Sequence, residues 1–209
     1  MFARSLGFAF AVGAAMLMSQ AANATVVSYT DKATWTAAAG SPVFNTTTDS
    51  NPLATWITSI DLNGGGALSL SDMVIVAQAG TPSWATWSGG YTGIVYDVHF
   101  DKTITLSFSG LSGFGLEIEP APQTSVDINV TLNDGTTFTQ TVNGLGGAAF
   151  FGWTGEGIDS LTISSSEFFA FGNLYSVKAA NAAPEPLTLA LLGTGLAGMT
   201  FVRRRKRMA

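Results

Sequence analysis

The sequence predicts an all-β protein: an antiparallel β-sandwich or jelly-roll-like domain, flanked by an N-terminal signal peptide and a C-terminal transmembrane helix. Three observations predict the sandwich. The central part of the chain is rich in Thr, Ser, Gly, Val and aromatic residues, which suit half-buried strands. Residues 126–132 alternate apolar and polar with period two. Many short segments of this kind follow one another between turn residues, without a long helix.

The start of the chain has the three parts of a secretory signal peptide. Arg4 supplies the positive charge, residues 6–18 are apolar, and Ala22-Asn23-Ala24 forms a small-x-small cleavage site. We therefore expect residues 1–24 to be a signal peptide and residues 25–178 to form the sandwich domain.

The first elements of the domain are a strand and a helix. Residues 26–29 are predicted to be the first strand, and residues 31–38 a short helix that Thr30 or Asp31 caps. The remaining strands are then predicted at 94–100, 103–108, 114–119, 126–132, 136–142, 148–153, 158–164 and 168–177.

Two pairs of these strands are predicted to be hairpins. Asn133-Asp134-Gly135 separates 126–132 from 136–142, and Asp101-Lys102 separates 94–100 from 103–108. Each connection is short enough for its two strands to pair directly.

Charge and cysteine content exclude several classes of function. Residues 25–183 hold three cations and thirteen carboxylates, a formal charge of −10. Such a domain is a poor ligand for nucleic acid or anionic lipid. The chain has no Cys, which excludes thiol catalysis, thiolate metal sites and disulfides. We expect no enzymatic activity, no cofactor and no nucleic-acid partner.

Glu117 and Glu119 are the first candidate for chemistry. Two residues apart on a strand, they share a face, and paired carboxylates are what glycoside hydrolysis requires. Simple alternation of polar and apolar residues gives the same pattern, and Pro120 favours a strand that runs out to an edge. We expect a solvated strand face.

Asp97, His99 and Asp101 also share a strand face. Their side chains are suited to a metal site or to acid–base chemistry, or else they form a polar face near a turn. No residue is assigned as a metal ligand. Structural calcium is compatible with thirteen carboxylates, with its ligands unknown.

Trp84, Trp87 and Tyr91 lie in a stretch rich in Gly and Ser. Flat aromatic rings offer sugars an apolar face with polar groups at the edge, so we predict carbohydrate contact here. The alternative is that these rings anchor a long loop to the sandwich. The two Trp are too close in sequence to share a strand face, so at least one is expected to be exposed.

The end of the chain combines a short motif, an apolar segment and a basic cluster. Pro184-Glu185-Pro186 follows a predicted linker at 179–183 and precedes sixteen uncharged residues, 187–202. A helix of that length spans ~24 Å against a hydrocarbon core of ~30 Å, and basic side chains extend the span. A buried soluble helix is the alternative, but the segment has no polar face. The positive-inside rule places the following stop-transfer residues in the cytoplasm: Arg203, Arg204, Arg205, Lys206 and Arg207.

This three-part arrangement resembles the PEP-CTERM sorting signal of exported bacterial proteins. The resemblance covers residues 184 to about 207 of a sorting segment that we predict at 184–209. It implies that exosortase, a membrane protease, recognises Pro184, Glu185 and Pro186 and removes the helix. It further implies a Gram-negative host that makes exopolysaccharide. We expect transient anchoring in the inner membrane, then delivery to the cell surface or outside.

The domain is similar to the sandwich that often precedes such signals. The resemblance lies in Phe150-Phe151-Gly152-Trp153, Ile158-Asp159-Ser160-Leu161 and the segment 169–174. The family pattern places an Asp before Asn173, where this chain has Gly172. We expect a non-enzymatic component of exopolysaccharide or biofilm matrix, with exosortase and exopolysaccharide as partners. The alternative is a carbohydrate-binding module that uses Trp84, Trp87 and Tyr91.

Overall fold

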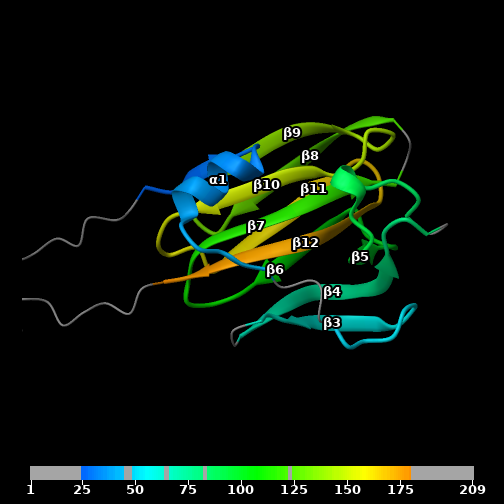
Figure 1. The fold of residues 1–209 in the computed structure, drawn as a ribbon, viewed down its shortest axis with the longest axis horizontal. Helices are drawn as coiled ribbons and strands as arrows, with labels where there is room; N and C mark the ends of the chain where they lie inside the picture. The colour runs from blue at the N-terminus through cyan, green and yellow to red at the C-terminus, as the bar shows by residue number, and fades with distance from the viewer. Residues whose placement is uncertain (1–24, 45–48, 64–65, 82–83, 122–123, 180–209) are drawn as a thin grey trace, which may run out of the picture.

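The computed structural model describes residues 25–44, 49–63, 66–81, 84–121 and 124–179 (Figure 1). The predicted signal peptide, most of the linker and the whole sorting segment lie outside these ranges. Within them, no helix is both long and apolar enough to cross a membrane.

The described residues form twelve strands, one α-helix and one short 3-10 helix, so the predicted all-β fold is confirmed. In chain order the elements are β1 (Val27–Tyr29), α1 (Lys32–Ala39), β2 (Val43–Phe44), β3 (Trp56–Asp61), β4 (Ala67–Gln78), η1 (Ser88–Gly90), β5 (Ile94–Val98), β6 (Thr103–Ser107), β7 (Leu111–Pro120), β8 (Ser125–Leu132), β9 (Thr137–Asn143), β10 (Ala149–Thr154), β11 (Ser160–Ser165) and β12 (Phe169–Lys178).

The strands form one antiparallel sheet that folds over on itself into two layers. The order is β1-β10-β7-β12-β5-β4-β6-β11-β8-β9, with β2 added to β12 and β3 added to β4. The long strand β4 makes the corner, because residues 75–78 pair with β5 while Ser69 and Leu70 pair with β6. The front layer in Figure 1 holds β10, β7 and β12, with β8 and β11 behind it.

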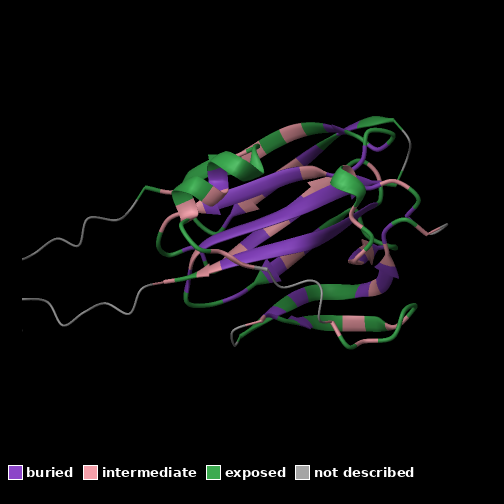
Figure 2. Ribbon diagram, viewed as in Figure 1, coloured by how far each residue is buried: buried purple, intermediate pink, exposed green. Residues whose placement is uncertain are grey.

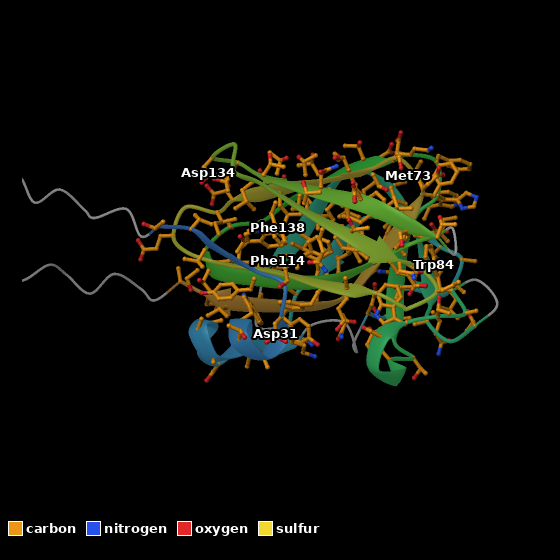
Figure 3. All side chains as sticks on the ribbon, turned by 90° about the horizontal axis from the view of Figure 1, so that it is seen from above. Asp31, Met73, Trp84, Phe114, Asp134 and Phe138 are labelled. Carbon is orange, nitrogen blue, oxygen red and sulfur yellow. The ribbon has the colours of Figure 1, made fainter. Side chains whose placement is uncertain are left out.

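The main core fills the space between the two layers. In β8 the apolar residues alternate inward as predicted, with Ile128 and Val130 fully buried. Figure 3 shows Phe114 and Phe138 between the layers, and Figure 2 shows buried residues concentrated on the central strands. The largest side chains in this core include Tyr96, Phe114, Phe151, Trp153, Phe169 and Phe171.

One predicted hairpin is confirmed and the other is wrong. β8 pairs with β9 around Gly135, which has the positive φ of 85° that such a turn favours. β5 and β6 do not pair with each other: β5 lies between β4 and β12, and β6 between β4 and β11. Residues 99–102 therefore cross from one layer to the other, because the corner strand β4 belongs to both.

The sequence pattern did not predict the strands β2, β3 and β4. The alternation of buried and exposed residues in β4 breaks at Ser71, Asp72 and Met73, which are exposed where the strand turns the corner. The pairing of β3 with β4 is shifted between Ile57 and Ser59. Interrupted periodicity of this kind hides a strand from pattern reasoning.

The helix α1 covers one end of the sheet's outer face, meaning the face of the front layer that points away from the main core. Asp31 caps it as predicted, its Oδ1 accepting a 2.7 Å hydrogen bond from Thr34 N. Trp35 is fully buried, and its Nε1 donates to Trp153 O at 3.0 Å. Gly152 gives this indole room, because a Cβ there would lie 2.7 Å from Trp35 Cδ1.

Candidate functional site

The sheet register brings three carboxylates from distant parts of the sequence onto the outer face. Residues that pair directly across strands point to the same side, and two neighbouring rows of such pairs cross this layer. The first row is Glu119, Ala170, Asp97, Ile75 and Trp56. The second row is Phe150, Glu117, Gly172, Val95 and Ala77.

Residues 84–91, called the aromatic loop below, cover the middle of these rows. Figure 3 shows η1, which belongs to this loop, on the same side of the sandwich as α1. Trp84 and Trp87 are only 6% and 9% exposed. They pack on a floor of small side chains that lets two indoles approach the sheet: Ala77, Ala79, Val95, Ala148 and Ala170.

The expectation that Trp84 or Trp87 is exposed is therefore wrong. Tyr91 is half-buried beside Trp87, with ring centroids 6.1 Å apart, and its hydroxyl donates to Ile94 O at 2.9 Å. The three rings anchor the loop, which was the alternative interpretation. Carbohydrate contact through them stays a prediction, and it requires the loop to lift from the sheet.

Glu117 lies beneath the aromatic loop and accepts three hydrogen bonds. Trp87 Nε1 donates to Oε2 at 2.8 Å, Ser88 Oγ donates to Oε2 at 3.2 Å, and Asn173 Nδ2 donates to Oε1 at 2.7 Å. The predicted solvated face is wrong, since Glu117 is 6% exposed. Its strand β7 is interior, between β10 and β12, so Pro120 does not mark a sheet edge.

Glu119 is 2% exposed and contacts the same loop through Thr86. The Thr86 hydroxyl lies within hydrogen-bond distance of Glu119 Oε1 and, at 2.9 Å, of Gly144 O. The direction of the first contact is from the Thr86 hydroxyl to the carboxyl oxygen of Glu119. Among the described residues, Glu119 Oε2 has no hydrogen-bond partner. Burial raises the pKa of Glu119 to about 7, against an opposing hydrogen bond from Thr86.

Asn173 reaches Glu117 because β12 is irregular at this point. Asn173 has a φ of 50°, and the pairing of β12 with β7 shifts between Gly172 and Tyr175. Gly172 has no space for the Asp of the family pattern, since a Cβ there would lie 2.9 Å from Val95 Cγ1 and 3.1 Å from Ile94 O. The contact between Asn173 and Glu117 was missed, and the match of Asn173 to the pattern was its only sequence signal.

Asp97, His99 and Asp101 do not converge on one point. His99 Nδ1 lies 3.2 Å from Asp97 Oδ2. Burial raises the pKa of Asp97, which hydrogen bonds from His99 and Trp84 oppose. Asp101 instead pairs with Asp72, and this hydrogen bond raises the pKa of Asp101 and lowers that of Asp72. Within the described ranges, no group of three His, Cys, Asp or Glu is arranged to hold a metal.

These contacts give the carboxylates a structural task. Each one bonds a different part of the aromatic loop: Asp97 with Trp84, Glu119 with Thr86, and Glu117 with Trp87 and Ser88. Acid–base chemistry needs a carboxyl that can reach a substrate. Here the loop lies between Glu117 or Glu119 and solvent.

We predict that stability falls as the pH rises through the range set by Glu119. Its pKa is about 4.5 unfolded and about 7 folded, so the folded state binds the proton more tightly. The contribution is complete below pH 4.5 and lost as the pH rises past 7. Allowing for solvent screening, we expect a loss of about 2 kcal/mol.

Urea unfolding at pH 5, 6, 7 and 8 measures this slope, with Glu119→Gln as the matched variant. The neutral amide has no proton to lose, so the variant should show most of the slope removed. An equal slope in both proteins would show that another group is responsible.

Comparisons with known proteins identify the C-terminal segment. A family model described as the PEP-CTERM protein-sorting motif matches residues 182–206. The chain thus carries this sorting signal, which supports an exported protein that exosortase processes. No curated protein matches the chain.

One solved structure that matches is the enzymatically active domain of tailspike protein 4 from bacteriophage CBA120. The sequence identity is 11%, and the match covers 55% of this chain and 19% of that one. The TM-score of 0.27 is too low to establish a shared fold.

Proposed function

We propose that this protein is a non-enzymatic component of an exopolysaccharide or biofilm matrix, released at the cell surface by an exosortase-type protease. The sorting motif supports the route. The observation that carries the non-enzymatic part is the engagement of the buried carboxylates by the aromatic loop. Glu117 already accepts three donors, and Glu119 is bonded to Thr86.

The position of the chain ends supports a surface role. The first and last strands meet at one end of the sheet, where Val27 pairs with Thr154, Thr154 with Gly113, and Gly113 with Val177. Figure 1 shows β12 ending at the left of the view. β12 has ten residues, so its first residue lies about 30 Å from its last residue, after which the tail follows. Trp56, at the start of β3, lies near that far end of the sandwich.

A carbohydrate-binding module that uses Trp84, Trp87 and Tyr91 remains the second candidate from sequence. Burial of both indoles weighs against it, because their faces already pack on the sheet. A glycan would have to replace those contacts.

We predict that replacing Glu185 and Pro186 with Ala blocks release. The family motif is what the protease is expected to read, so the variant should stay in the inner membrane with its tail attached. Immunoblots of membrane and extracellular fractions measure this directly.

Glu156→Ala is the matched control, because Glu156 is an exposed carboxylate of the folded domain. It should be released like the natural protein. Normal release of the Glu185 and Pro186 variant would contradict the proposed route.

A further inference from the structure

Three aromatic side chains, Trp56, His99 and Phe100, form an exposed group that we call the aromatic platform. Trp56 is 40% exposed and Phe100 is 75% exposed. Their rings are stacked, with centroids 5.3 Å apart and planes 6° from parallel. His99 meets both rings edge-on, at 6.4 Å from Trp56 and 4.9 Å from Phe100.

A hollow of about 530 Å³ lies beside the platform, and His99 belongs to both. This volume is in the range of small-ligand sites. The hollow combines an apolar floor with hydrogen-bonding groups. Its lining includes Leu53, Ile75, Gln78, Thr81, Asp97 and His99.

The platform is placed by the edge of the sheet. Trp56, Ile75 and Asp97 lie in one row across β3, β4 and β5, so they point to the outer face. Among the described strands, β3 pairs with β4 alone. Phe100 follows β5 in the connection that crosses between layers. The main core contains neither Trp56 nor Phe100, so packing there does not require them.

Large aromatic residues gathered on the surface mark a contact site more often than a scattered apolar residue does. Flat rings beside hydrogen-bonding groups match sugars, which have apolar ring faces and hydroxyl edges. The charge around the platform indicates which sugars would bind. Asp72, Asp97 and Asp101 lie near the platform, while the neighbouring cation Lys102 lies 3.7 Å from Glu167. An anionic glycan would be repelled.

We propose that the aromatic platform and its hollow bind a neutral polysaccharide. This inference rests on the proposed function, because it names the surface through which the protein would associate with the matrix. The site lies at the end of β12 opposite to Lys178, where the chain continues toward the sorting segment. Binding there is compatible with a tail that is still attached.

The test uses the exported protein, purified and incubated with insoluble neutral polysaccharides: cellulose, curdlan and chitin. The depletion of protein from solution gives a dissociation constant. The double variant Trp56→Ala, Phe100→Ala should bind whichever of these polysaccharides the natural protein binds at least about tenfold more weakly, since it removes both stacked rings that would face the sugar. Trp56→Phe should keep part of the affinity, and soluble alginate, an anionic glycan, should not compete.

Leu145→Ala is the control, because Leu145 is a 60% exposed apolar residue on another loop. Thermal unfolding confirms that each variant is folded. Binding that is equal in the natural protein and the double variant overturns the platform but leaves matrix association intact. If the natural protein binds none of the three polysaccharides, both the platform as a glycan site and the matrix association are overturned. Self-association that the double variant abolishes, without any glycan binding, would reassign the platform to a second copy of the chain.

Discussion

Replacing Gly147 with Ala is expected to displace the aromatic loop and to lower the free energy of unfolding by about 3 kcal/mol. Gly147 has a φ of 89°, and a Cβ there would lie 2.8 Å from Ser88 N and 2.9 Å from Trp87 C. Both atoms belong to the backbone, so no side-chain rotation relieves the clash. The loop must move, and Trp87 loses its contact with Glu117.

Gly135→Ala is a matched control for this variant. Gly135 has a similar φ of 85°, but nothing lies within 4 Å of its Cβ position. Gly135→Ala should lower the free energy of unfolding by about 1 kcal/mol, because it adds only backbone strain. Urea unfolding gives both values, and hydrogen exchange of the Trp87 indole N–H reports loop opening. Equal losses, with indole exchange unchanged in the Gly147 variant, would show that the loop is not seated against Gly147.

Removing the carboxylate of Glu117 is expected to lower the free energy of unfolding by about 3 to 4 kcal/mol. Glu117→Ala leaves the donors of Trp87 and Asn173 in a buried site without their acceptor, and each lost bond to a charged group contributes about 1.5 to 3 kcal/mol. Glu117→Gln should cost less, because the amide oxygen still accepts from one side while its NH₂ group faces a donor on the other.

Glu119→Gln is the comparison that separates the two carboxyls. Burial raises the pKa of Glu119 to about 7, so this carboxyl is protonated in the folded protein at pH 5. A neutral amide of the same shape should therefore change the unfolding free energy at pH 5 by less than about 1 kcal/mol. Urea unfolding of Glu117→Ala, Glu117→Gln and Glu119→Gln at the same pH compares what the two carboxyls contribute to stability. A Glu117→Ala protein as stable as the natural one would remove the structural task assigned to this carboxylate.

Local chemistry made part of the fold predictable. The alternation in β8, the turn at Gly135 and the Asp31 cap each depend on a few neighbouring residues, and each is confirmed. The pairing of β5 was not predictable in the same way. It depends on β4, which turns a corner at Ser71 and so lacks the regular period that identifies a strand.

The candidate site could not be predicted from the sequence, because its contacts join residues that are far apart in the chain. Glu117 and Trp87 are 30 residues apart, and Glu117 and Asn173 are 56 apart. The sequence makes Glu117 and Trp87 separate candidates, one for acid–base chemistry and one for carbohydrate contact. Only the sheet register and the fold of the aromatic loop place one over the other.

Local composition predicted exposed aromatic rings at positions where the structure buries them. Trp84 and Trp87 lie in a stretch rich in Gly and Ser, which is typical of open loops, yet a floor of alanines accepts them. Trp56 lies in a strand that pattern reasoning did not predict, and its neighbour Phe100 comes from another part of the chain. Their stacking is a property of the folded surface.

The proposed function requires that the protein reaches the cell exterior without its tail and stays there with polysaccharide. The most direct measurement is the intact mass of the protein that co-purifies with exopolysaccharide washed from the cells. We expect a mass that corresponds to a chain starting near Thr25 and ending near Pro184–Pro186. A protein found only in the inner membrane, with a mass that retains residues 187–209, would show that the chain is a tethered periplasmic protein and not a matrix component.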